Sequence, residues 1–274
     1  MIRHCAKVIR SEIRAGRTGG PTSGLAAGYV QAGVAIVPAS HADDFARFCA
    51  ANPASCPLLY RSEPGRPLLA PAGDDIDVRS DLPRYRVYRK NRDCEEVTDI
   101  TGHWRDDLVT FLLGCSFSFE EALITAGLEV RNISTGKNIP IYRTAIACTP
   151  SGPFSANLAV SMRPFGADQL NLVHSISGRY PLLHGEPVSA GDPQHLGIAD
   201  LREPDFGDAV SIAEGEEPVF WACSATACEA LQNAGLDFCV THSPGHMLVT
   251  DRLASKMENI SAGTVPAWND TAAR

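Results

Sequence analysis

The sequence predicts an α/β protein: a discontinuous three-layer α/β domain built from both chain ends, with a smaller α+β domain inserted between them. Strand, helix, strand patterns over residues 33–60 and 218–242 predict this class, because short apolar strands alternating with helices favour parallel pairing in a sheet covered on both faces. The middle of the chain instead places helices beside paired strands. We therefore expect residues 1–110 and 211–254 in the discontinuous domain, 111–210 in the insertion and 255–274 as a flexible tail.

The first elements follow from local patterns. Ile2, Ile9 and Ile13 recur at roughly helical spacing among basic residues. This stretch also resembles a short basic transit peptide, but Glu12 and the direct run into a glycine-rich segment favour the first helix of a mature domain. Next, "GVAIVP" predicts a strand, "HADDFARFCAANP" an amphipathic helix closed by a proline, and "PLLY" a second strand.

The remaining elements are expected in a different order. Residues 106–127 predict two helical stretches around a break, followed by the strands "IPIYRTAIAC" and "NLAVSMRPF". A helix over residues 167–180 precedes a loop-rich stretch, 181–210. Near the other end, "PVFWACS", "ATACEALQNAG" and "DFCVTH" repeat the strand, helix, strand pattern. We expect the two chain ends to share one sheet.

Composition favours a small molecule as the partner. The net charge of -8 and the lack of a clustered basic stripe argue against nucleic acid, because neutralising phosphates requires concentrated Lys and Arg. No apolar run approaches the roughly 20 residues of a membrane helix. Nine cysteines without CxxC pairs favour reduced thiols, and hence the cytoplasm. A homodimer is left open.

A glycine-rich stretch, "GPTSGLAAGYVQAG", carries Thr22 and Ser23. Backbone N–H groups and hydroxyls in such a loop can bind an anion at a helix start. No lysine follows in the pattern of a nucleotide phosphate loop, so a nucleotide site is not expected. A turn with tight packing at Gly24 and Gly28 is the alternative.

Three arginines are candidate carboxylate clamps, because the planar guanidinium binds a carboxylate through two hydrogen bonds. Arg105 precedes Asp106 and Asp107 at an expected helix start, where acidic residues also favour the helix dipole. Arg143 and Arg163 lie inside apolar strand-like runs, where an arginine needs a partner. Each is therefore half of an internal ion pair or an anion clamp.

Histidines form the next group of candidates. His184 lies in the loop-rich stretch, and His242 and His246 are four residues apart. Pro244 and Gly245 make the connection a turn rather than a helix. A divalent metal could still be held through loop geometry with a nearby carboxylate, but no strong metal motif is present, so we expect no cofactor.

The segment "GCSFSFEEAL" offers two kinds of chemistry. Ser116 or Ser118 can cap the following helix, and Ser118 with Glu121 has the spacing of a capping box. Cys115 has no nearby histidine or asparagine in sequence to serve as its base, and a cysteine among apolar residues is more often a packing residue. Glu120 is the better candidate for acid or base catalysis.

Several stretches, in order from about Gly20 to Asp251, together resemble a hydro-lyase family that includes D-glutamate cyclase. They include "VTDITGHWRDDLVTFLLGCSFSFEEAL", "NIPIYRTAI", "VSMRP", "HGEPV", "PDFGDAV", "PVFWAC" and "THSPGHMLVTD". The resemblance implies a two-domain α/β fold and loss of water from D-glutamate to give 5-oxo-D-proline. Where the family has GVTPQ after the WAC motif, this chain reads "CSATACEA".

These observations favour a lyase that acts on a small amino dicarboxylic acid by acid/base chemistry. A non-catalytic protein that binds a carboxylate metabolite, and a metal-dependent hydratase, are the alternatives. The reaction needs a base, an acid and arginine clamps. The candidates are Glu120 or His242 as base, His246 or an aspartate such as Asp107 as acid, Arg105, Arg143 and Arg163 as clamps, and Ser116, Ser118, Thr22, Ser23 and His184 as further substrate contacts.

Overall fold

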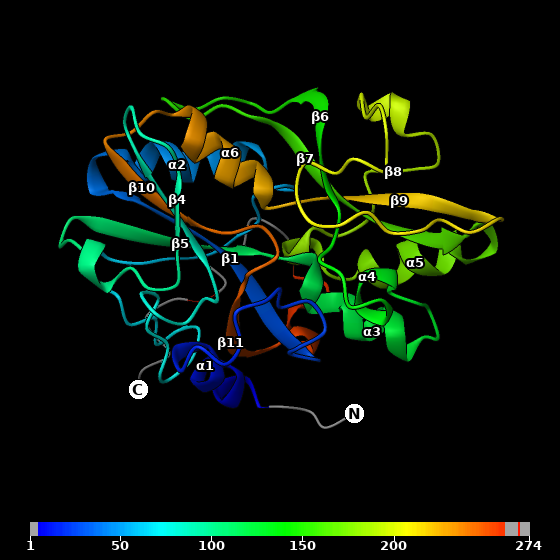
Figure 1. Cartoon of the computed structure of the whole chain (residues 1–274), viewed down its shortest axis with the longest axis horizontal. Helices are drawn as coiled ribbons and strands as arrows, with labels where there is room; N and C mark the ends of the chain where they lie inside the picture. The colour runs from blue at the N-terminus through cyan, green and yellow to red at the C-terminus, as the bar shows by residue number, and fades with distance from the viewer. Residues whose placement is uncertain (1–4, 261–267, 269–274) are drawn as a thin grey trace.

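The computed structural model describes residues 5–260 and Trp268. Two antiparallel sheets, surrounded by helices and long connections, form the described part of the chain (Figure 1). The mixed α/β class predicted from the sequence is confirmed.

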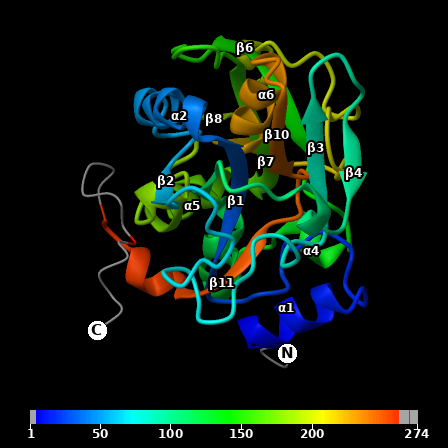
Figure 2. The same cartoon turned by 90° about the vertical axis from the view of Figure 1, so that its left-hand side faces the viewer.

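The first sheet has the strand order β2-β5-β1-β10-β3-β4, and β11 also pairs with β1. Figure 2 shows β2 and the β3–β4 hairpin at opposite edges of this sheet. Its strands are β1 (Tyr29–Pro38), β2 (Leu58–Arg61), β3 (Tyr85–Arg89), β4 (Glu95–Val97), β5 (Leu108–Gly114), β10 (Phe238–His242) and β11 (Leu248–Leu253).

Alternation along β1 gives this sheet two apolar faces. Val34 and Ile36 belong to one buried cluster, whereas Ala35 and Val37 belong to another. Two helices, α2 (Ala39–Ala51) and α6 (Ala225–Asn233), contribute to the second cluster and lie on the same side of the sheet (Figure 1). Such two-sided burial explains why these strands are apolar at nearly every position.

The second sheet has the order β6-β7-β9-β8. Its strands are β6 (Ile141–Ala147), β7 (Asn157–Gly166), β8 (Ser189–Ala190) and β9 (Glu216–Ala222). On β7, Val160 and Met162 pack into an apolar cluster, while Ser161 and Arg163 alternate with them and lie on the opposite face. The second sheet therefore directs polar side chains of β7 towards the interior.

The remaining short helices lie in the connections between strands or, for η6, directly after β11. They are α3 (Glu120–Thr125), α4 (Arg131–Ser134), α5 (Leu170–Ser177) and the 3-10 helices η1 (Thr101–His103), η2 (Ser116–Phe119), η3 (Ala167–Gln169), η4 (Pro181–Leu183), η5 (Pro193–Leu196) and η6 (Ala254–Met257).

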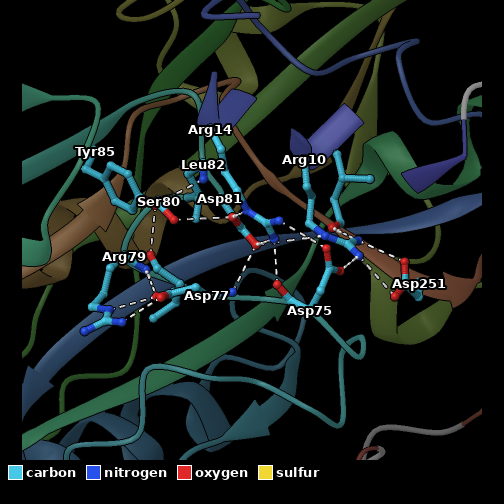
Figure 3. Close-up of polar contacts among 12 residues, drawn as sticks. Arg10, Arg14, Asp75, Asp77, Arg79, Ser80, Asp81, Leu82, Tyr85 and Asp251 are labelled. Atoms are coloured by element: carbon cyan, nitrogen blue, oxygen red, sulfur yellow. Dashed lines mark hydrogen bonds and ion pairs between the residues drawn. The ribbon is translucent and has the colours of Figure 1, made fainter. Parts of the chain in front are cut away.

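The predicted N-terminal helix is present as α1 (Ala6–Arg14), and a buried ionic network holds it in place (Figure 3). Arg10 donates to Asp251 at 2.9 Å and also pairs with Asp75. Arg14 donates to Asp81 at 2.7 Å and to Asp75 at 3.1 Å. Because Asp81 is fully buried, its carboxylate requires this partner, so the network ties α1 to β11 and to the loop before β3.

The expected parallel pairing is wrong. β1 and β2 run in the same direction, as their strand, helix, strand pattern requires, but β5 lies between them and is antiparallel to both. The predicted helix over the first half of residues 106–127 is therefore also wrong, because residues 108–114 form β5. A short apolar run does not distinguish a buried strand from a buried helix.

The prediction that residues 33–38 and 218–224 share a sheet is also wrong. Residues 33–38 lie in β1 of the first sheet, whereas β9 pairs with β7 in the second, from Val160 opposite Ala222 to Gly166 opposite Glu216. The division into domains at residues 110 and 210 stays a prediction. The expected tail begins with η6, where Met257 is buried, and apart from Trp268 its residues beyond 260 lie outside the described part.

Candidate functional site

A buried ion pair joins the start of α3 to β7. Arg163 Nη2 donates to Glu120 Oε1 at 2.6 Å, and both side chains are almost fully buried, with 0% and 2% exposed. The same nitrogen donates to Ser116 Oγ at 3.1 Å, and Ser23 Oγ donates to Glu120 Oε2 at 2.8 Å. Burial raises the pKa of Glu120, and the charge of Arg163 and the hydrogen bonds oppose that rise.

Several buried polar atoms around this pair have no hydrogen-bond partner within the described part of the chain. Arg163 uses only Nη2, and its Nε and Nη1 are unpartnered. The other atoms are Ser161 Oγ, Trp221 Nε1 and His184 Nε2. Buried polar groups are normally satisfied, so such a concentration around one guanidinium is typical of a place where a polar ligand or water binds.

A small cavity of about 10 Å³ adjoins the ion pair through Ser116. This volume is roughly that needed by one water molecule. Four segments of the chain and Ser161 of β7 line the cavity. The segments contribute residues 115–117, residues 139 and 141, residues 223–225, and residues 242, 244, 245 and 247. The cavity therefore collects predicted site residues, Ser116 and His242, from distant parts of the sequence.

The cavity lies where the first sheet splits. β10 pairs with β1 at Ala35 and Ile36, and β11 pairs with it at Gln31 and Ala32, so neither pairs at the residues between. At Val34 the imidazole of His242 contacts the β1 backbone where a neighbouring strand would otherwise pair. Its Nδ1 lies 3.1 Å from both the backbone nitrogen and the carbonyl oxygen of Val34.

Gly33 allows this close approach. A Cβ atom at this position would lie 2.9 Å from Ser224 Oγ and 3.1 Å from His242 Cε1. Any side chain here would press on two residues that line the cavity. The glycine is thus required by packing around the site, and its φ is not unusual.

Burial keeps the histidines near the site neutral. It lowers the pKa of His242 to about 4 and that of His184 to about 4, and it lowers the pKa of His246. His184 Nδ1 lies 2.7 Å from the carbonyl oxygen of Ala54, and His246 Nδ1 lies 3.0 Å from that of Pro244. His242 lines the cavity, while His246 does not.

Cys115 also lines the cavity, but as a buried thiol. Burial raises its pKa above the usual range, and burial raises the pKa of Cys223 to about 11. A thiol is a strong nucleophile only as the thiolate, so both groups are inert at neutral pH. The sequence interpretation of Cys115 as a packing residue agrees with its place in an apolar cluster.

Two predicted site residues pair with each other at the surface. Arg105 donates to Asp107 at 2.8 Å and 3.0 Å, and both side chains are about half exposed. They precede β5, whereas the cavity begins after its last residue, so the length of a seven-residue strand separates them. The predicted helix start at this position is wrong, because the residues lead into a strand.

Arg143 is also distant from the cavity lining. Its Nη1 pairs with Asp205 at 2.7 Å and its Nε with Glu229, and its side chain is 46% exposed. The structure shows an ion pair for both Arg143 and Arg163, and a role of either residue as an anion clamp stays a prediction. Of these two arginines, Arg163 alone has buried nitrogens without a hydrogen-bond partner among the described residues.

The predicted hydroxyl contacts have different surroundings. Ser23 bonds to Glu120, and Thr22 Oγ1 accepts from the backbone nitrogen of Met247 at 3.0 Å. Ser118 Oγ accepts from Gln31 N at 3.0 Å and donates to its carbonyl at 3.2 Å. Ser118 therefore fastens η2 to β1, and the predicted capping box is wrong, because α3 has no side-chain cap.

Sequence reasoning missed Ser161 and Ser224. Ser161 is two residues before Arg163 on β7, so strand alternation would have placed both on one face. Ser224 directly precedes α6, and its role as a lining residue follows only from the fold around Gly33.

Two further features are absent from the described residues. No group of three or more His, Cys, Asp or Glu side chains in residues 5–260 is arranged to hold a metal ion. Among the helices that the structure describes, none combines the length and apolar character needed to cross a membrane. The cofactor expectation stays a prediction.

Comparison with known proteins places these residues in a family context. A family model described as D-glutamate cyclase matches residues 109–251, which include Glu120, Arg163 and His242. A Bordetella petrii protein named "Putative hydro-lyase" is 56% identical over 248 residues, covering 90% of this chain and 94% of its own. Proteins of the same name from Jannaschia sp. (52% over 246 residues, 90% and 92%) and Rubrobacter xylanophilus (51% over 249 residues, 91% and 96%) are similar over comparable shares.

Proposed function

The chain belongs to the D-glutamate cyclase family and is a lyase, and we propose that it closes D-glutamate to 5-oxo-D-proline with loss of water. In this reaction the amino nitrogen bonds to the γ-carboxyl carbon and a C–O bond breaks. The ammonium group loses two protons in all, and the departing oxygen gains two and leaves as water. The protein must therefore hold a carboxylate and move protons.

The observation that carries this proposal is the buried Arg163, which has two nitrogens without a partner among the described residues and contacts the cavity lining through Ser116. A substrate carboxylate would satisfy nitrogens that now lack partners, in surroundings where a charged hydrogen bond is strong. Ser116 and Ser161 supply hydroxyl groups on the same side. The cavity thus presents donors suited to an acidic small molecule.

We assign proton transfer to Glu120 rather than to His242. Burial raises the pKa of Glu120 and so favours the protonated form of its carboxyl, which a general acid needs. Burial lowers the pKa of His242 to about 4, so its imidazole is a weak base and serves as a neutral hydrogen-bonding group. Pairs of titratable groups whose pKa values are shifted in opposite directions, as those of Glu120 and His242 are, are typical of acid/base sites.

The cytoplasm is the location we propose. All nine cysteines lie in the described residues and are unpaired, as expected for proteins kept in a reducing compartment.

Incubation with D-glutamate, L-glutamate and 5-oxo-D-proline, followed by proton NMR, tests the function. We expect interconversion of D-glutamate and 5-oxo-D-proline and none with L-glutamate. Arg163→Met should lose this activity, whereas Arg105→Met, which alters a half-exposed arginine away from the cavity, should keep it. Ligand-induced thermal stabilisation without turnover would instead support the carboxylate-binding alternative.

A further inference from the structure

The cavity is too small for the proposed substrate. At about 10 Å³ it holds roughly one water molecule, and an amino dicarboxylic acid is several times larger. A wall of the cavity must therefore move before such a molecule reaches Ser116 and Arg163. The segment that moves should border on solvent and be released without breaking either sheet.

One segment lies against the lining of the cavity from outside and borders on solvent. Phe206 packs against the apolar cluster that includes the cavity-lining residues Cys115, Phe117 and Ile141. Within that cluster, Phe206 is only partly buried. Residues 205–208, here named the strap, follow a largely exposed stretch of loop.

The strap is attached along the outer edge of β6. Phe206 exchanges two backbone hydrogen bonds with Ile141, at 2.9 Å and 3.1 Å. Asp205 accepts from the backbone nitrogen of Arg143 and pairs with its guanidinium, both at 2.7 Å. Asp208 accepts from the backbone nitrogen of Asn138 at 2.8 Å. β6 is an edge strand, so the strap occupies positions where a further strand would pair.

The strap packs closely against the rest of the protein, but the ion pair that holds it is partly exposed to solvent. The Phe206 ring lies between two guanidinium groups, 5.2 Å from Arg86 and 4.8 Å from Arg143. A Cβ atom on Gly207 would lie 1.9 Å from the carbonyl oxygen of Ile139, so the strap lies directly against this chain. Water screens the ion pair of Asp205, because its side chain is 30% exposed and that of Arg143 46%.

We propose that residues 205–208 form a gate, which detaches from β6 to admit the substrate and closes again with Phe206 against the apolar cluster that lines the cavity. The identity of the substrate rests on the proposed function, but the opening of the gate does not. Release of the strap breaks a short pairing at a sheet edge and leaves both sheets intact, so it belongs to the low-energy openings of a native protein.

The native cysteines report on this opening. Cys115 lines the cavity and is 5% exposed, Cys5 is exposed, and Cys49 and Cys239 lie in the separate core on the α2 and α6 side. Native protein is treated with N-ethylmaleimide, the reaction is quenched at set times, and modification of each cysteine is measured by peptide mass spectrometry. Cys5 serves as the reference for reagent activity.

Asp205→Asn removes the charge that fastens the strap, and Asp200→Asn is the matched control, because Asp200 pairs with Arg202 within the same loop. We expect Asp205→Asn to increase the labelling rate of Cys115 several-fold, with Cys49 and Cys239 unchanged. Asp200→Asn should leave all rates at the wild-type level. If Asp205→Asn does not fold, Asp208→Asn releases the other end of the strap and has the same expected result.

An unchanged rate at Cys115 would overturn the gate, and so would an increase shared by Cys49 and Cys239, because that pattern reports global unfolding. Addition of D-glutamate separates the two proposals. Protection of Cys115 supports both the gate and the substrate, whereas opening in Asp205→Asn without protection by D-glutamate supports the gate and counts against the proposed substrate.

Discussion

Removing either member of the Glu120–Arg163 pair should destabilise the protein, but the loss should depend on pH in only one of the two variants. Glu120→Gln keeps the shape of the side chain and leaves the buried guanidinium without a counter-charge. Arginine cannot lose its proton in proteins, so nothing relieves this cost. Breaking a fully buried pair costs about 3–5 kcal/mol, which a protein with a stability of roughly 5–15 kcal/mol can tolerate while folded.

Arg163→Met leaves a buried carboxyl, which can escape its charge by binding a proton. Without the guanidinium, the pKa of Glu120 rises further above its unfolded value. A group with a raised folded pKa binds a proton in the native state that the unfolded state lacks, so its contribution to stability is full at low pH and is lost as pH rises. The cost of Arg163→Met should therefore fall on acidification by up to about 1.4 kcal/mol per pH unit.

The double variant Glu120→Gln/Arg163→Met removes both charges and should recover on the order of 2 kcal/mol of the summed single losses. Urea unfolding followed by circular dichroism, at pH 7.5 and pH 5.5, measures all four proteins. The double variant should remain inactive, which separates catalysis from stability. Equal, pH-independent losses in the two single variants would refute the reasoning, since they would mean that Glu120 is not a buried, charged partner of Arg163.

Three further predictions concern other residues. Cys115→Ala should leave most of the activity, because burial raises the pKa of the thiol and keeps it protonated. Steady-state kinetics with D-glutamate measures this. An inactive variant with a normal circular dichroism spectrum would show instead that the thiol is a catalytic group. Gly245→Ala should lower the melting temperature far more than the control Gly235→Ala. Both glycines have a positive φ, but a Cβ atom at Gly245 would lie 2.1 Å from the Asn138 side chain, whereas one at Gly235 would meet no atom within 4 Å. Similar shifts in the two variants would contradict this packing argument. Burial lowers the pKa of His184 to about 4, below its unfolded value of about 6.5, so the stability that it contributes above pH 6.5 is lost as the pH falls towards 4. His184→Asn should therefore reduce the slope of the unfolding free energy against pH between these two values. An unchanged slope would show that His184 is not buried in its neutral form.

The sequence alone determined the local features of this protein. Apolar spacing located α1, β1, α2 and the strand that carries Arg163, because periodicity reports which side chains share a face. An arginine inside an apolar strand implied a buried partner, which the structure identifies as Glu120. The motifs between about Gly20 and Asp251 indicated the family, since such long runs reflect common descent rather than local physics.

Only the tertiary structure decided which segments meet. Periodicity records the face of a strand but not its neighbour, so the insertion of β5 between β1 and β2, and the pairing of β9 with β7, were not predictable. The same limit applied to the site. Arg105 and Arg163 carry the same chemistry in sequence, yet one stands half exposed before β5 and the other is buried beside the cavity, because burial and partners depend on contacts between residues far apart along the chain.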